Sequence, residues 1–141
     1  MNTSLNNTQQ QDQTKYILSQ ISSYIDDEKD KTLLKVLFIV PESAGDIFLS
    51  TSLLSSLKEM YSPCKIYFAC YPQFFDILKN NPYVHRCIPY HPIMDNQVVM
   101  EGSGEWVGLF DISIMSTILT QRVTNYLNNG MGKIAFNIKK K

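Results

Sequence analysis

The chain has 141 residues, of which 44% are hydrophobic and 18% are charged. This length and composition predict one folded domain with its own core, and they exclude a chain that is disordered throughout. Thirteen Lys and Arg residues balance thirteen Asp and Glu residues, so there is no global positive field to hold a nucleic acid by counterion release.

Residues 1–14 form a polar segment that is rich in Asn, Gln and Thr. A segment with so little to bury predicts a disordered tail. It has neither the basic start nor the apolar centre of a signal peptide. No apolar run in the chain approaches the roughly 20 residues that cross a bilayer. We therefore expect a cytoplasmic protein with no membrane span.

Residues 15–30 carry an amphipathic pattern. Apolar side chains recur at helical spacing and fall on one face, at Ile17, Leu18, Ile21, Tyr24 and Ile25. The spacing predicts a helix. Its apolar face either packs on the domain or offers Ile17, Ile21, Tyr24 and Ile25 to a protein partner.

From residue 31 onward, strand patterns and helix patterns alternate. Strand patterns occupy residues 33–40, 64–71, 83–90, 109–115 and 132–138, and helix patterns occupy residues 46–61, 72–80 and 116–130. Such alternation is typical of an α/β fold with an open parallel sheet. We expect a single Rossmann-like domain over residues 31–141 with about five parallel strands. Residues 33–40 should lie near its centre, because they are the most continuously apolar.

A glycine-rich segment, residues 91–108, separates the third and fourth strand patterns and contains the only Trp of the chain. We expect it to cross the carboxyl end of the sheet, where ligands bind in this architecture. A short helix is predicted near residues 96–101. Trp106 has two interpretations: its ring stacks on a sugar as part of a substrate-binding site, or it anchors the loop.

The three cysteines are Cys64, Cys70 and Cys87, and they share no CxxC spacing. This argues against a zinc knuckle and against a disulfide framework. His85 and His91 lie near Cys87 in the sequence, but a metal site needs a larger set of ligands in fixed geometry. We expect reduced thiols and no bound metal.

The turn after the expected central strand, residues 41–46, reads Pro-Glu-Ser-Ala-Gly-Asp. With its single Gly, it matches neither the dinucleotide fingerprint nor the Walker phosphate loop. Asp46 has two interpretations. It caps the next helix by accepting from the backbone N–H of Phe48 or Leu49, or it is a general base that draws a proton from a sugar hydroxyl.

Residues 35–89 resemble the amino-terminal domain of glycosyltransferase family 9, the ADP-heptose:lipopolysaccharide heptosyltransferases. The most specific shared element is a Ser-x-Gly-Asp turn between the first strand and an apolar helix, here Ser43, Ala44, Gly45 and Asp46. A strand and a helix follow, and then the segment Asn81-Pro82-Tyr83-Val84. Residues 110–115 and 132–137 are also similar to later segments of that domain.

The resemblance implies an inverting glycosyltransferase of GT-B architecture, in which the active site lies between two Rossmann-like domains. It implies that Asp46 is the general base and that Ser43, Ala44 and Gly45 bind substrate beside it, and we expect no cofactor. Residues 31–141 correspond to the first domain only. We therefore expect the acceptor-side half of the enzyme, which takes a sugar acceptor and needs a partner domain or chain to bind the nucleotide-sugar donor. The alternative is a noncatalytic domain that serves as a binding or assembly module.

Overall fold

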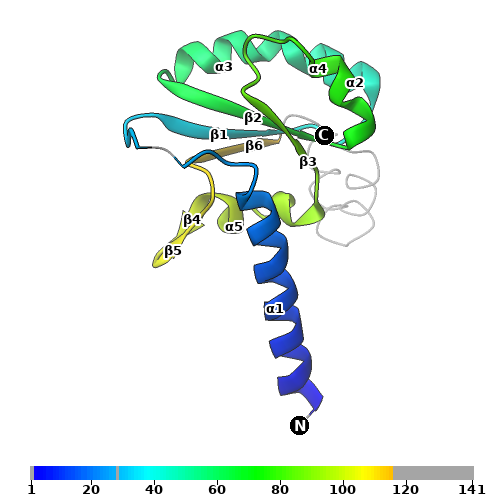
Figure 1. Ribbon diagram of the computed structural model, residues 1–141, viewed down its shortest axis with the longest axis vertical. Coiled ribbons are helices and arrows are strands. Elements are labelled where there is room, and N and C mark those ends of the chain that lie inside the picture. Colours follow the sequence, from blue (N-terminus) through cyan, green and yellow to red (C-terminus); the bar gives the residue numbers. More distant parts are fainter. Residues whose placement is uncertain (1, 28, 116–141) are drawn as a thin grey trace, which may run out of the picture.

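The computed structural model describes residues 2–27 and 29–115, which fold as an α/β domain around a parallel sheet with helices on both faces (Figure 1). Four strands form this sheet in the order β3-β2-β1-β6: β1 (Leu34–Ile39), β2 (Cys64–Cys70), β3 (Arg86–Pro89) and β6 (Ile112–Met115). The predicted helix over residues 116–130 and the predicted strand over residues 132–138 lie outside the described residues.

The prediction that residues 33–40 form an internal strand is confirmed. β1 pairs in parallel with β2 on one side and with β6 on the other, so that Val36 lies beside both Ile66 and Ile112. Residues 36–40 are all buried. A strand that is covered on both faces has no polar side, which explains its continuous run of apolar residues.

Alternate side chains of the strands supply two separate cores, one on each face of the sheet. On one face, Phe38 and Phe68 pack with their ring centroids 5.3 Å apart. This face is covered by α2 (Ala44–Ser50), α3 (Leu54–Met60) and α4 (Phe75–Leu78), through buried Ile47, Leu54 and Leu78. On the other face, Tyr67 packs against Phe110 with centroids 5.7 Å apart.

The helix that follows β1 is interrupted. A continuous helix was predicted, but a 3-10 turn, η1 (Thr51–Leu53), separates α2 from α3. The hydroxyls of Ser50, Thr51 and Ser52 donate to the backbone carbonyls of Asp46, Phe48 and Leu49 at 2.5–2.7 Å. Such back-bonding competes with the regular helical pattern and bends helices. The break therefore follows from the three adjacent hydroxyl residues.

The amino-terminal helix α1 (Asn2–Ser22) is longer at its start, and shorter at its end, than the helix predicted over residues 15–30. The segment that we expected to be a disordered tail is helical, and residues 7–14 are exposed. Residues 2–22 contain neither Gly nor Pro. Once the later turns of the helix are anchored on the sheet, each further residue extends it at little cost, because helix growth is easier than nucleation.

The apolar face of α1 packs on its own domain. Leu18 and Ile21 are buried in the core beneath the sheet, and Ile17 and Ile25 pack against it partly exposed. Tyr24, in contrast, keeps 36% of its surface exposed. The first turns of α1 extend away from the sheet (Figure 1). Packing on the domain is thus confirmed for Ile17, Ile21 and Ile25, and contact of this face of α1 with a protein partner stays a prediction.

The segment between β3 and β6 contains η3 (Pro92–Asp95), α5 (Gln97–Glu101) and a hairpin of β4 (Gly102–Ser103) and β5 (Trp106–Val107). The predicted short helix is therefore confirmed. η3 lies near the carboxyl ends of β1 and β6, but α5 and the hairpin continue beneath the sheet on the side of α1 (Figure 1). The expectation that the whole segment crosses the carboxyl end is wrong, because Met94 and Met100 are buried in the lower core.

Two glycines allow the close approach of the chain at this hairpin. A Cβ on Gly108 would lie 2.3 Å from the carbonyl oxygen of Met100, and a Cβ on Gly102 would lie 2.5 Å from that of Trp106. Gly102 also has a φ of 97°, which side chains other than glycine rarely adopt. These positions explain the glycine content of the segment without a role in ligand binding.

Candidate functional site

The turn predicted to hold the catalytic residue follows β1 at the carboxyl edge of the sheet. α2 begins at Ala44 and Ser43 is its N-cap, and the backbone carbonyl of Ser43 accepts from the N–H of Ile47 at 2.9 Å. Asp46 lies in the first turn of the helix. The interpretation of Asp46 as the helix cap is therefore wrong, because the helix begins at Ala44 and not at Asp46.

The structure brings the four predicted residues of this turn together. Ser43, Ala44, Gly45 and Asp46 are all exposed. Within residues 2–27 and 29–115, the Asp46 carboxylate has no hydrogen bond or ion pair with another side chain. A negative charge in the first turn of a helix interacts favourably with the positive end of the helix dipole. The Asp46 carboxylate is thus accessible to a hydrogen-bond donor outside the chain.

A substitution at Gly45 can test how the turn affects stability without changing the Asp46 carboxylate. A Cβ added there would meet no atom within 4 Å. We expect Gly45→Ala to raise the free energy of unfolding by about 0.4–1 kcal/mol, because alanine restricts the unfolded chain more than glycine does. Urea denaturation measures the change. Gly104→Ala is the matched control, since its site is equally open but has a φ of 60°, and it should give no gain. Loss of stability in Gly45→Ala would contradict this account of the turn.

Trp106 does not join the turn. Its indole Nε1–H donates to the carbonyl of Val99 at 3.1 Å, and its ring lines a groove with residues of α1 that include Gln10, Thr14 and Leu18. The hairpin that carries Trp106 and the helix α2 lie at opposite ends and on opposite sides of the sheet (Figure 1). A role for Trp106 in the same sugar site as Asp46 therefore has no geometric support, whereas the anchoring role does.

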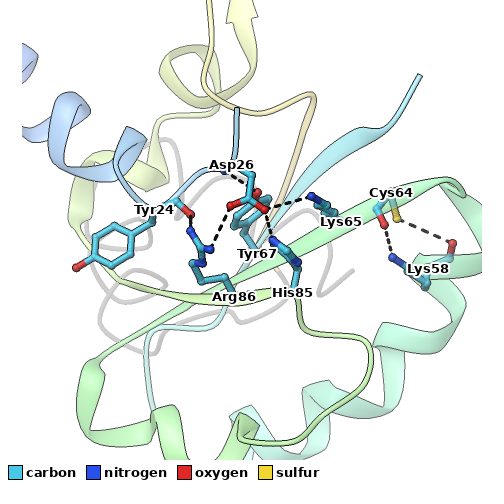
Figure 2. Close-up of polar contacts among 8 residues, drawn as sticks. All are labelled: Tyr24, Asp26, Lys58, Cys64, Lys65, Tyr67, His85 and Arg86. Atoms are coloured by element: carbon cyan, nitrogen blue, oxygen red, sulfur yellow. Dashed lines mark hydrogen bonds and ion pairs between the residues drawn. The ribbon is translucent and has the colours of Figure 1, made fainter. Parts of the chain in front are cut away.

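A second polar constellation lies at the opposite, amino end of the strands (Figure 2). Asp26, in the connection after α1, is its centre. Lys65 Nζ and His85 Nε2 lie 3.1 Å and 2.6 Å from Asp26 Oδ2, and Arg86 lies 3.1 Å from Asp26 Oδ1. The backbone N–H of Asp26 donates to the hydroxyl of Tyr67 at 3.1 Å. We refer to Asp26, Lys65, His85 and Arg86 as the Asp26 cluster.

Sequence reasoning missed the Asp26 cluster because its members are distant in the chain. One signal was present. Lys65 is the only charged residue of β2, a strand whose other six residues are all buried. A cation in such a strand requires a charged partner or an exit to solvent. His85 was considered only as a metal ligand, and its actual partner is a carboxylate.

The Asp26 cluster makes stability depend on pH. Hydrogen bonds from Lys65 and His85 lower the pKa of Asp26 below its ordinary value of 3.8. A lowered pKa in the folded state means that the carboxylate stabilises the fold above the unfolded pKa, and that this contribution is lost as the pH falls through the folded pKa. We expect the unfolding free energy of the wild type to fall more steeply than that of Asp26→Asn between about pH 5 and pH 2. Parallel urea denaturation curves over this window measure the difference, and equal slopes would contradict it.

All three cysteines are free thiols. Burial raises the pKa of Cys70 to about 12, and burial also raises the pKa of Cys64 and Cys87. A thiol with a raised pKa is a poor nucleophile and a poor metal ligand at neutral pH. We therefore assign the cysteines to packing.

The structure thus defines a class: an α/β domain on a parallel sheet, with an exposed acidic turn at the carboxyl end of an internal strand. Across the described ranges 2–27 and 29–115, no helix has the length and apolar character needed to cross a membrane, and no group of His, Cys, Asp and Glu is placed to hold a metal ion. Comparison with known protein families, with curated proteins and with solved structures finds no match.

Proposed function

We propose that this chain is the acceptor-side half of an inverting glycosyltransferase similar to the heptosyltransferases of family 9. The observation that carries the proposal is the placement of Asp46. Its carboxylate is exposed, has no hydrogen bond or ion pair with another described side chain, and lies in the first turn of α2, the helix that follows the internal strand β1. In an open parallel sheet, this is the edge at which substrates bind.

In the proposed reaction, the acceptor hydroxyl lies against the turn formed by Ser43, Ala44, Gly45 and Asp46. Asp46 takes the proton of this hydroxyl while its oxygen attacks the anomeric carbon of the donor from the face opposite the nucleotide. The bond from the anomeric carbon to the nucleotide diphosphate breaks, and the configuration at that carbon is inverted. The nucleotide diphosphate leaves as an anion and takes the bonding electrons with it. It therefore needs no proton from this chain, and the proton of the acceptor hydroxyl ends on Asp46.

The proposal requires a second component, because the exposed turn by itself leaves the reacting groups in water. A donor-binding half, in another domain or chain, would hold the nucleotide-sugar over Asp46 and exclude solvent, and positioning of this kind supplies much of the rate enhancement of enzymes. The proposal also includes a Rossmann-like sheet in which residues 132–138 supply a fifth strand, and a cytoplasmic location. Release of nucleotide from a nucleotide-sugar, measured with the chain, a candidate donor half and an acceptor sugar, tests it.

A noncatalytic binding module is the second candidate, and one observation favours it. Phe48, Leu49 and Leu53 are 67%, 68% and 49% exposed on the outer side of α2 and η1. Such an apolar group on the surface is typical of a contact with another protein. This surface adjoins Asp46 along the same helix, and it differs from the face of α1 that we first considered for a partner. If the folded chain shows no turnover with any donor half that is tried, the result would favour the noncatalytic binding module.

A further inference from the structure

The groove between α1 and the hairpin of β4 and β5 has the size of a ligand site. Both walls lie on the face of the sheet that is opposite to α2 and Asp46 (Figure 1). Its volume is about 440 Å³, and small-molecule sites usually measure roughly 300–1,000 Å³. Trp106 forms one wall. The other wall is a single face of α1, whose side chains recur at helical spacing: Asn7, Gln10, Gln11, Thr14, Lys15 and Leu18.

Trp106 presents a fixed aromatic ring to this groove. Its Nε1–H donates to the carbonyl of Val99 at 3.1 Å, so the polar atom of the indole is already satisfied within the chain. The side chain nevertheless remains 48% exposed, and its neighbour Val107 is 86% exposed. What Trp106 offers to a ligand is therefore the apolar ring. The face of such a ring is electronegative and attracts the weakly positive C–H groups of a ligand.

The wall on α1 offers hydrogen bonds with little charge. The amides of Asn7, Gln10 and Gln11 each carry two donors and an acceptor oxygen, and none of them has a hydrogen bond to another described residue. The hydroxyl of Thr14 donates to the carbonyl of Gln10 at 2.9 Å, which leaves its oxygen able to accept. Lys15 is the only charged side chain among the described residues that line the groove. A phosphate or a nucleic acid would need more positive charge than this wall supplies.

We propose that this groove is a binding site for a neutral pyranose sugar, separate from the site of Asp46. A pyranose ring carries C–H groups on its faces, which suit the ring of Trp106, and hydroxyls around its edge. Each hydroxyl both donates and accepts, as the amides of α1 do. A purely apolar ligand would instead cover these amides and leave them without partners, which is unfavourable. The combination of one aromatic wall and one amide wall therefore favours a sugar.

The fluorescence of Trp106 reports on the groove directly, because the chain contains no other Trp. The probes are maltose, cellobiose, lactose and mannobiose, which are neutral and differ in stereochemistry and linkage. Sorbitol is the control, since it has the hydroxyls of a sugar but no ring face. We expect a saturable change in fluorescence with at least one disaccharide and none with sorbitol. A folded chain that responds to no disaccharide, or that responds equally to sorbitol, overturns the proposal.

Substitutions in the two walls test the proposed contacts by saturation-transfer NMR on the sugar, which does not depend on the fluorescence of Trp106. Gln10→Ala removes an amide that bonds the sugar, so it should weaken binding roughly two- to tenfold. Gln9→Ala is its control, because Gln9 is exposed and does not line the groove, and it should bind as the wild type does. Equal binding by Gln10→Ala and the wild type overturns the contact with α1.

Two substitutions of Trp106 separate its ring from the stability of the hairpin. Trp106→Phe keeps an aromatic face and should retain weakened binding, whereas Trp106→Ala should abolish it. In the wild type, saturation transfer should be strongest at the C–H protons of one face of the sugar. Unchanged binding by Trp106→Ala overturns the proposal, as does a folded Trp106→Phe chain that binds no sugar.

The sugar site is tested independently of the proposed transferase, because the binding experiments need no donor half. Asp46→Asn should bind the disaccharide as the wild type does, whatever its effect on turnover. Analytical ultracentrifugation examines the other occupant that could cover the groove, a second copy of the chain. A dimer whose dissociation on dilution changes the fluorescence of Trp106 without any sugar would assign the groove to self-association and overturn the proposal.

Discussion

We expect Asp46→Asn to lower the turnover of the proposed transferase, reconstituted with a donor half, by roughly 10²- to 10⁴-fold, which is the usual contribution of a general base. Asparagine has nearly the same shape as aspartate but does not take up the proton of the acceptor hydroxyl. The exposed side chain makes no hydrogen bond or ion pair with another side chain among the described residues. We therefore expect the unfolding free energy to change by no more than the loss of a favourable charge near a helix start, about 0.3–1 kcal/mol.

Asp76→Asn provides the matched control for this experiment. Asp76 is also exposed and also lies in the first turn of a helix, α4, so the substitution removes the same interaction with a helix dipole. Turnover should stay at the wild-type level in Asp76→Asn and fall only in Asp46→Asn. Steady-state rates of nucleotide release measure both. Unchanged turnover in Asp46→Asn would refute the assignment of the base and leave Asp46 as a helix-start charge.

The sequence was informative wherever a side-chain pattern and the sheet geometry impose the same constraint. Residues 36–40 are apolar without interruption, and only a strand covered on both faces explains this. The pattern predicted an internal, parallel β1 correctly. Asn96–Glu101 was also predicted to contain a helix, and the Asn96 side chain does accept from the N–H of Val99 at 3.3 Å at its start. A helix cap of this kind involves only a few neighbouring residues, so it can be predicted without knowledge of the tertiary contacts.

Features that depend on tertiary contacts were not predictable. The extension of α1 through residues 2–14 depends on the anchoring of Leu18 and Ile21 against the sheet, while the polar composition of the segment favoured disorder. The break at η1 depends on whether hydroxyls bond back to the helix or point to solvent, and the sequence shows only that hydroxyls are present. Burial of Met94 and Met100 likewise decided the path of the loop that carries Trp106.

The turn of residues 43–46 and the Asp26 cluster also differ in whether the sequence could predict them. The turn from Ser43 to Asp46 is contiguous, so its residues are together in any fold that places a strand before a helix. The Asp26 cluster joins Asp26 to Lys65 and His85 across 39 and 59 positions of the chain. No spacing rule connects such residues. Only the register of β2 with β3, which places Tyr67 beside Arg86, brings them to one point.

Tyr67 is the residue through which the lower core and the Asp26 cluster depend on each other. Its side chain is fully buried, its ring contacts Phe110 and His85 edge-on, and its hydroxyl accepts from the backbone N–H of Asp26. We expect Tyr67→Ala to lower the unfolding free energy by roughly 3–5 kcal/mol, as for other large aromatic side chains deleted from a core. For a domain of this size, that is a large part of the total stability.

Two further variants separate the contributions of Tyr67. Tyr67→Phe keeps the ring and deletes only the hydroxyl, so it should cost at least about 1 kcal/mol, the net value of a hydrogen bond such as the one from the N–H of Asp26. Tyr16→Ala, at a position that is 64% exposed, should change stability by no more than about 0.5 kcal/mol. Urea denaturation of the three variants measures how much unfolding free energy each one loses. If Tyr67→Phe were as damaging as Tyr67→Ala, the hydroxyl contact with Asp26, and not the packing of the ring, would hold α1 against the sheet.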